Sequence, residues 1–170
     1  MYFKKISNII MDNVCRAIKR REISMEKIKI KRMRENAAIP TKGSEKSAGY
    51  DLYACLDKPV FINPHETVMI STGVSMELPD GTFGAIVARS GISVKRGLAP
   101  ANKIGVCDSD YRGEYMVALH NHSNTTQWVN PGERIAQLIV MPYVDVIFEE
   151  TDELSETDRG EGGFGSTGTN

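Results

Sequence analysis

Short runs rich in β-branched and aromatic residues, separated by turn signals, make up most of the sequence after residue 50. The runs are residues 50–55, 68–70, 74–78, 83–88, 115–119, 135–140 and 144–148. The breaks between them include Asn63-Pro64, Pro79-Asp80-Gly81, residues 121–124 and Asn130-Pro131-Gly132. Many short strands joined by short turns predict an all-β barrel or sandwich.

The N-terminal part of the chain has a different pattern. Apolar residues recur at loosely helical spacing in residues 6–22, which predicts a short amphipathic helix outside the domain. From Lys27 the period changes to two, with Ile28, Ile30 and Arg32 on one face, which predicts a half-exposed first strand. We therefore expect a basic extension (1–26), a β domain (27–148) and an acidic, glycine-rich arm (149–170); whether Met25 is an alternative start stays open.

Charge and composition exclude several classes of protein. Residues 1–34 hold 11 Lys/Arg against 3 Asp/Glu, but the only basic cluster is Lys19-Arg20-Arg21 and no aromatic is interleaved with it, so we expect a solvated helix and no nucleic-acid partner. No apolar run approaches the roughly 20 residues of a membrane span, so no membrane partner is expected. Three widely spaced cysteines favour a reducing compartment, intracellular and either cytoplasmic or nuclear, with a mitochondrial address left open.

The chain ends in a glycine-rich tail, Arg159-Gly160-Glu161-Gly162-Gly163-Phe164-Gly165-Ser166-Thr167-Gly168. Glycines let backbone N–H groups crowd around an anion, hydroxyl groups and Arg add donors, and an aromatic ring can lie flat on a base. The tail is therefore either a lid over a nucleotide or a flexible end without function. It is not a Walker loop, because no GxxxxGK[ST] or GxGxxG arrangement precedes a helix.

Polar residues inside the domain form further candidates. Residues 102–114 carry two carboxylates and a phenol within residues 108–111; they either place a base and an aromatic wall against a ligand or form an acidic turn bonded to its own backbone. The stretch Ala88-Arg89-Ser90-Gly91 ends a predicted strand with groups that bind phosphate. Asp51 and Gln137 lie in apolar strands, where an unpaired polar group costs about 1–3 kcal/mol, and each is either a site residue or a paired structural group.

Together and in this order, these five stretches resemble the five motifs of the trimeric dUTP pyrophosphatase family. The resemblance runs from about Ile28 to the C-terminus. It implies a jelly-roll-like distorted β-barrel of the β-clip type that assembles as a homotrimer, with active sites at subunit interfaces. It also implies hydrolysis of dUTP to dUMP and pyrophosphate with Mg²⁺ as cofactor, which limits uracil incorporation into DNA and supplies dUMP for dTTP synthesis.

The same resemblance implies a role for each matched residue. Asp108 would activate the attacking water, Tyr111 would pack against the deoxyribose, and Asp51 would hold a Mg²⁺-bound water. Uracil would be recognised by Asn102 and the backbone of Ile104, Gly105, Val106 and Cys107; phosphate would be bound by Arg89, Ser90, Gly91 and Gln137. In the closing arm, Phe164 would cover uracil and Arg159, Ser166 and Thr167 would contact the β- and γ-phosphates, with Gly165 between them.

Some residues depart from the family pattern or fall outside it. Cys107 stands where the family more often has an aliphatic residue, and we interpret it as a small hydrophobe and not a catalytic thiol. His65, His120 and His122 have no place in the family mechanism. Two alternative functions stay open: a dCTP deaminase of the same superfamily, which would lack the glycine-rich arm, and a catalytically inactive nucleotide-binding or signalling protein.

Overall fold

The computed structural model describes residues 27–163, and that part of the chain is all-β except for one short helix. The strands are β1 (Lys29–Arg32), β2 (Thr41–Lys42), β3 (Tyr50–Tyr53), β4 (Val60–Ile62), β5 (Thr67–Ser71), β6 (Val74–Glu77), β7 (Thr82–Val87), β8 (Leu98–Pro100), β9 (Ile104–Cys107), β10 (Met116–Asn121), β11 (Gln127–Val129) and β12 (Arg134–Pro142). The helix α2 (Ser90–Arg96) follows β7. The helix predicted over residues 6–22 lies outside the described residues.

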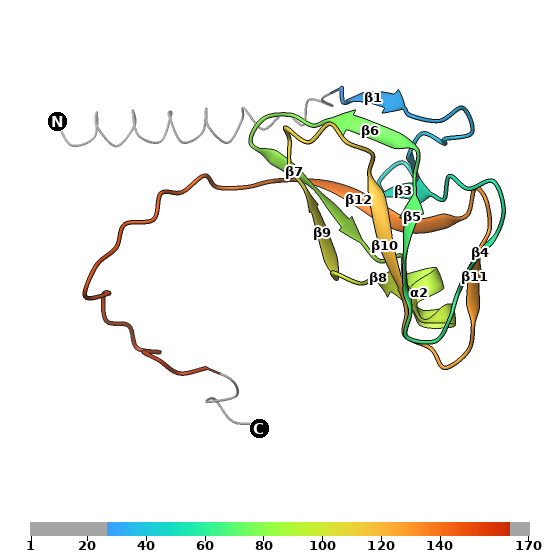
Figure 1. The fold of residues 1–170 in the computed structure, drawn as a ribbon. Helices are drawn as coiled ribbons and strands as arrows, with labels where there is room; N and C mark the ends of the chain where they lie inside the picture. The colour runs from blue at the N-terminus through green and yellow to red at the C-terminus, as the bar shows by residue number, and fades with distance from the viewer. Residues whose placement is uncertain (1–26, 164–170) are drawn as a thin grey trace.

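The strands form four small antiparallel sheets that wrap around one core (Figure 1). The largest has the order β2-β3-β12-β7-β9, a second has the order β5-β10-β8, and β1-β6 and β11-β4 are two-stranded. In the largest sheet β12 is central, and its Gln137 lies opposite Asp51 of β3 and Val87 of β7. Since β9 pairs with β7 alone, β9 is an edge of this sheet.

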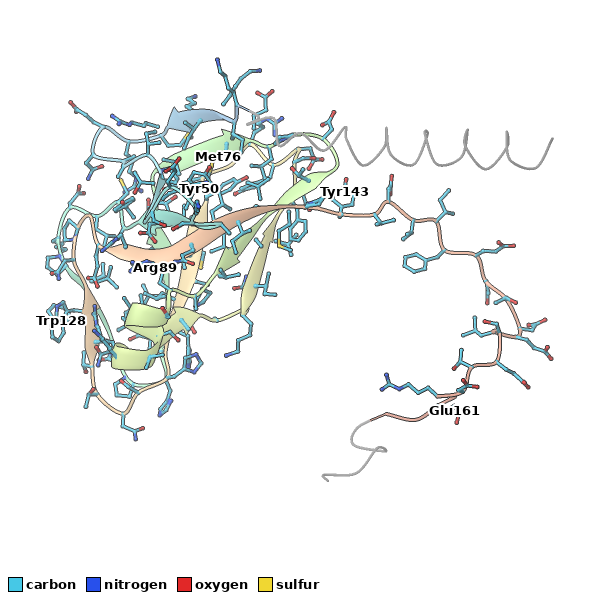
Figure 2. All side chains as sticks on the ribbon, turned by 180° about the vertical axis from the view of Figure 1, so that it is seen from behind. Tyr50, Met76, Arg89, Trp128, Tyr143 and Glu161 are labelled. Atoms are coloured by element: carbon cyan, nitrogen blue, oxygen red, sulfur yellow. The ribbon has the colours of Figure 1, made fainter. Side chains whose placement is uncertain are left out.

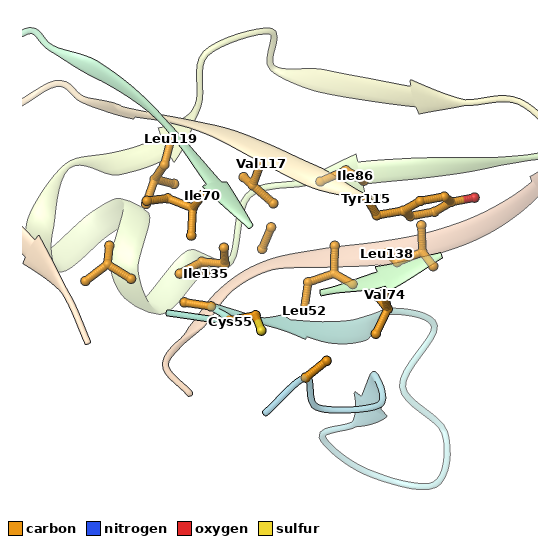
Figure 3. Packing of buried hydrophobic residues seen from close by; sticks show 14 of the residues in the cluster. Leu52, Cys55, Ile70, Val74, Ile86, Tyr115, Val117, Leu119, Ile135 and Leu138 are labelled. Atoms are coloured by element: carbon orange, nitrogen blue, oxygen red, sulfur yellow. The ribbon is translucent and has the colours of Figure 1, made fainter. Parts of the chain in front are cut away.

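Buried apolar residues from several strands build the core. In β10, Val117 and Leu119 are buried, whereas Met116, the first residue of the strand, is exposed, as expected for a strand with one face toward the core. Figure 3 shows side chains from β3, β5, β6, β7, β10 and β12 meeting in one cluster, with the ring of Tyr115 at its end. The cluster includes Leu52, Ile70, Val74, Ile86, Val117, Leu119, Ile135 and Leu138. Short strands from distant parts of the sequence are therefore held together by shared burial of apolar surface.

Most strands expected from the sequence are present. The runs at 50–55, 68–70, 74–78, 83–88, 115–119 and 135–140 correspond to β3, β5, β6, β7, β10 and β12, and the period of two after Lys27 corresponds to β1. In β1, Ile30 is half-buried and its neighbours are exposed, but Arg32, expected on the same face, is exposed too. The prediction of an all-β domain is confirmed.

One predicted strand is wrong. Residues 144–148 are extended but pair with no strand among residues 27–163, and Val144, Ile147 and Phe148 are 83%, 97% and 94% exposed. Within residues 27–163 the apolar pattern of this segment has no partner strand. After Tyr143, whose N–H donates to the Gly81 carbonyl at 3.2 Å, the chain leaves the barrel.

Several elements were not expected. Strands β2, β4, β8 and β11 have only two or three residues, too few for an alternating pattern. The seven-residue α2 has a single buried residue, Ile92, and ends at Gly97, which has φ 67° and lies against residues 122–123. A left-handed C-terminal cap requires such a φ, which glycine adopts without strain.

Candidate active site

Asp51 is a buried carboxylate held between two arginines. It is 4% exposed; Arg89 Nε donates to its Oδ1 at 2.7 Å and Arg134 Nη1 donates to its Oδ2 at 3.1 Å. Two guanidinium groups and one carboxylate leave a net positive charge, which suits a polyphosphate. Both carboxylate oxygens are already hydrogen-bonded to cations, so this buried carboxylate is fully paired.

The three residues line a pocket of about 350 Å³, together with Gly43, Ser47, Ala48, Gly49, Gln137 and Ile139. The strand register explains why Gln137 lines this pocket, because Gln137 lies directly opposite Asp51. A Cβ on Gly49 would lie 3.1 Å from Gln137 Oε1, so glycine there allows the loop to approach the amide closely. We call this the phosphate pocket; it joins Asp51, Arg89 and Gln137, which are far apart in the sequence.

The stretch Arg89-Ser90-Gly91 forms the turn from β7 into α2. Arg89 is the N-cap residue, and Ser90 and Gly91 open the helix, although the sequence had suggested only a strand end. The first N–H groups of a helix have no acceptor within the helix. Arg89 is the residue of this stretch that lines the phosphate pocket.

Strand β9 presents a free backbone edge. Its residues pair with β7 on one side only, from Ile104 opposite Val87 to Cys107 opposite Gly84. A Cβ on Gly105 would lie 3.3 Å from Ile86 Cβ on one side and 3.2 Å from Asn102 Nδ2 on the other. The N–H and C=O groups of an edge strand are available to a flat ligand that carries complementary donors and acceptors. The Ile104 N–H already donates to the Asn102 carbonyl at 2.6 Å, and the uracil-reading role expected of Asn102 and residues 104–107 stays a prediction.

Asp108 and Tyr111 follow directly after this edge and line a second pocket. A pocket of about 310 Å³ is lined by Asp108, Tyr111, Glu114 and Tyr115 together with Met69, Val106, Cys107 and Met116. Asp108 is exposed, and it also lines a neighbouring pocket with Phe83 and Tyr143. Tyr111 N–H donates to the Asp108 carbonyl at 3.2 Å, which closes a turn between these two pocket-lining residues. We call these residues the hairpin pocket.

Gly113 makes room for the ring of Tyr111. A Cβ at Gly113 would lie 2.5 Å from Tyr111 Cζ and 2.8 Å from Cε2, distances that real Cβ atoms essentially never show. We expect Gly113→Ala to displace the ring and to lower kcat/KM for the nucleotide substrate by up to about 10²-fold, because a displacement of about 1 Å at a site can have such an effect. Steady-state kinetics and a melting curve test this; a variant with unchanged kcat/KM would show that the ring position is not critical.

Burial raises the pKa of two groups of the hairpin pocket, the Cys107 thiol and the Tyr115 hydroxyl. Burial, with a smaller effect from the Asp108 charge, raises the pKa of the Cys107 thiol to about 11, so the thiol is protonated at neutral pH. Burial likewise raises the pKa of Tyr115 to about 12. A protonated, half-buried thiol is a poor nucleophile, which agrees with the interpretation of Cys107 as a small hydrophobe.

The two pockets share no lining residue and lie apart in one chain. In the sheet order, β9 is three strands from β3, about 14 Å at the usual strand spacing. Asp51 lies opposite Gln137, Gln137 lies opposite Val87, and Val87 lies opposite Ile104, so Asp51 and Ile104 lie at the same level of the sheet. Asp108 is four residues beyond Ile104, about 13 Å along the strand direction. The Asp108 carboxylate and the phosphate pocket of the same chain are therefore well separated.

The part of the tail that the structure describes, up to Gly163, is also away from both pockets. Figure 2 shows Tyr143 where the chain leaves the barrel and Glu161 far from it. Arg159 lies in this extended part, where its Nε donates to the Gly162 carbonyl at 2.7 Å. Phe164, Gly165, Ser166 and Thr167 lie outside the described residues.

Two residues of these pockets were not expected from the sequence. Arg134 bonds the Oδ2 of Asp51, and Glu114 lines the hairpin pocket. Arg134 gave no signal in the sequence, because three residues before Gln137 it would point to the opposite face of a regular strand; the register shift between Arg134 and Ala136 lets both line the same pocket. Glu114 gave no signal either, since its contacts involve a turn 41 residues earlier.

Residues 27–163 contain no cluster of three or more His, Cys, Asp or Glu side chains able to hold a metal ion. Mg²⁺ is commonly bound through one or two carboxylates plus substrate phosphates, with waters retained, and the phosphate pocket with its single carboxylate fits that donor set. In the same residues no helix has the length and apolarity needed to cross a membrane.

Comparison with known proteins assigns the chain to a family. The family model described as dUTPase matches residues 35–168. Deoxyuridine 5'-triphosphate nucleotidohydrolase of Burkholderia cenocepacia is 46% identical over 142 residues, covering 83% of this chain and 96% of its own length. The enzyme of the same name from Idiomarina loihiensis is 44% identical over 138 residues, which are 81% of this chain and 91% of its own.

Solved structures agree. A variant of the Staphylococcus bacteriophage 80alpha dUTPase with dUpNHpp has a TM-score of 0.78 and 26% identity, covering 85% of this chain and 100% of its own. A phage phi11 dUTPase variant, in which a structural Mg(II) ion is coordinated, has a TM-score of 0.70 and 23% identity, covering 77% of this chain and 100% of its own. The jelly-roll-like fold expected from the sequence is thereby confirmed. The chain belongs to the dUTPase family.

Proposed function

We propose that the protein hydrolyses dUTP to dUMP and pyrophosphate. The observation that carries this proposal is the free edge of β9 running directly into Asp108 and Tyr111, which offers base, sugar and water-activating contacts in consecutive residues. The 46% identity to a deoxyuridine 5'-triphosphate nucleotidohydrolase supports the same substrate. The resemblance covers the tail as well, which counts against a dCTP deaminase.

The residues divide the reaction between them. Backbone donors and acceptors of residues 104–107 pair with the uracil edge, and cytosine would leave buried polar groups unpaired, a mismatch that can reach about 10⁴–10⁵ in discrimination. Tyr111 packs against the deoxyribose where a 2′-hydroxyl would collide. Asp108 accepts the proton of a water aligned with the α-phosphorus. Alignment of this kind is worth roughly 7–11 kcal/mol in well-oriented systems.

The phosphate pocket binds the leaving group. Arg89 and Arg134 flank Asp51, and Gln137 lies beside them, so cationic and neutral donors face the phosphates. When bound, Mg²⁺ neutralises charge on the triphosphate and fixes its shape. Asp51 is held in place by accepting from both arginines and would hold a water of the metal's hydration shell. Ser90 and Gly91 add donors at the start of α2.

We propose that the complete site forms in a homotrimer. The two pockets lie too far apart in one chain, so a symmetric assembly that brings the hairpin pocket of one subunit to the phosphate pocket of the next completes the site. The exposed apolar segment 144–148 would dock on a neighbouring subunit. A suitable receptor is the apolar groove beside β1, lined by Ile28, Ile30, Tyr50, Met76, Leu138 and Val140, where one edge of β1 is unpaired among residues 27–163.

The arm then completes the enclosure. Docking of residues 144–148 on another subunit would bring the glycine-rich residues 159–168 to an active site of the same trimer. There Phe164 would cover uracil, and the phosphates would be contacted by Arg159, Gly165, Ser166 and Thr167. Closure would exclude bulk water during the reaction. Because nucleotide pools are inside cells, we propose an intracellular location.

A nucleotide panel tests the function. Purified protein with Mg²⁺ is expected to convert dUTP to dUMP and pyrophosphate and to leave dTTP, dCTP and UTP nearly unchanged. A chelator in the same assay is expected to remove most of the activity, because triphosphate charge is then not neutralised. Equal turnover of dCTP and dUTP would contradict the role of residues 104–107.

A further inference from the structure

Tyr111 is held by the loop that carries it. Its Oη donates to the backbone carbonyl of Glu114 at 3.1 Å, and the ring lies closely over Gly113. Tyr111 is 45% exposed, so packing alone does not fix the ring. Its position therefore depends on where the Glu114 backbone lies.

The side chain of Glu114 ties this loop to the turn between β5 and β6. Its Oε1 accepts a hydrogen bond from the Gly73 N–H at 2.7 Å and another from the Ser71 hydroxyl. Next to it, the Tyr115 N–H donates to the Val74 carbonyl at 2.8 Å. A carboxylate that accepts both a backbone N–H and a hydroxyl makes charge-assisted bonds, which are stronger than neutral ones.

The turn on the other side is anchored in the core. Gly73 has φ 68°, and a Cβ there would lie 2.7 Å from both Ala37 Cβ and Cys55 Sγ. Ala37 and Cys55 are 4% and 2% exposed. The Gly73 carbonyl accepts from the Met33 N–H at 2.7 Å, so the turn is bound from two sides. Glu114 thus joins the loop of the hairpin pocket to a fixed part of the barrel.

We propose that Glu114 is a positioning residue for sugar discrimination. Its carboxylate anchors the loop and thereby sets the position of the Glu114 backbone carbonyl. This carbonyl accepts the Tyr111 hydroxyl and holds the ring where it would collide with a 2′-hydroxyl. The inference rests on the proposed function, in which Tyr111 packs against deoxyribose. The Glu114 carboxylate acts through Tyr111 and needs no contact with the nucleotide.

The test compares kcat/KM for dUTP with kcat/KM for UTP in four proteins: wild type, Glu114→Ala, Glu114→Gln and Glu66→Ala. Glu66 is a matched control, since it is also a half-buried glutamate, and its Oε2 accepts the Asn63 N–H at 2.7 Å in a turn that lines neither pocket. The Gln variant retains an oxygen that can accept from Gly73 and Ser71. Melting temperatures are measured alongside.

We expect Glu114→Ala to lower the dUTP/UTP ratio by about tenfold or more, because a ring that moves no longer excludes the 2′-hydroxyl. Glu114→Gln is expected to retain most of the dUTP/UTP ratio. Glu66→Ala is expected to retain the full wild-type ratio, even if its melting temperature falls by as much as that of Glu114→Ala. A lower melting temperature for Glu114→Ala with the wild-type ratio would overturn the inference and leave the proposed function intact. Wild-type protein that turns over UTP as well as dUTP would overturn both.

Discussion

Replacing Asp108 by Asn is expected to lower kcat for dUTP by about 10²–10⁴-fold, the usual contribution of a general base, while binding of the nucleotide is largely retained. Asn has the shape of Asp and still accepts a hydrogen bond, but it cannot take a proton from water. Asp108 is exposed at the start of the turn to Tyr111, so the substitution leaves no buried group unpaired. The barrel should therefore be unaffected.

Two measurements separate catalysis from binding. Steady-state kinetics give kcat, and calorimetry with a dUTP analogue carrying an imido bridge between the α- and β-phosphates gives the affinity. Asp80→Asn is the matched control, because Asp80 is an exposed carboxylate in the turn before β7 and lines neither pocket. Asp108→Asn with wild-type kcat would remove Asp108 from the mechanism.

Much of this barrel was predictable because its longer strands have a local signal. β3, β5, β6, β7, β10 and β12 each combine β-branched or aromatic residues with a bounding turn, although burial alternates clearly only in β10. The short strands β4 and β11 have no such signal. They exist because residues 60–62 and 127–129 pair across 65 or more residues of sequence. Local propensity cannot predict a pairing that only the assembled core stabilises.

The failure at residues 144–148 has a related cause. Val144, Val146 and Phe148 form a pattern typical of a strand, but a strand needs a neighbour, and none is available within residues 27–163. The sequence indicates that the segment can form a β-strand, but it does not indicate which chain provides the neighbouring strand. The same holds for the site, where the motif residues were identifiable but their separation into two pockets was not.

That separation gives a sharp expectation for mixed assemblies. Asp51→Asn damages only the phosphate pocket and Asp108→Asn only the hairpin pocket, and we expect each pure variant to be nearly inactive. If each site takes one pocket from each of two subunits, random mixing of equal amounts gives about one quarter of sites with an intact Asp51 from one variant and an intact Asp108 from the other. Unfolding the two variants together and refolding them should therefore restore about one quarter of wild-type activity.

A second mixture shows whether the recovery has this origin. Wild type is refolded with an equal amount of the double variant Asp51→Asn, Asp108→Asn. Sites shared between subunits are intact only where two wild-type chains meet, which again gives about one quarter of full activity, whereas sites contained in one chain would give about one half. No recovery in the first mixture together with one half in the second would place both pockets of a working site in a single chain. The distance between Asp51 and Asp108 across β3, β12, β7 and β9 argues for the opposite outcome.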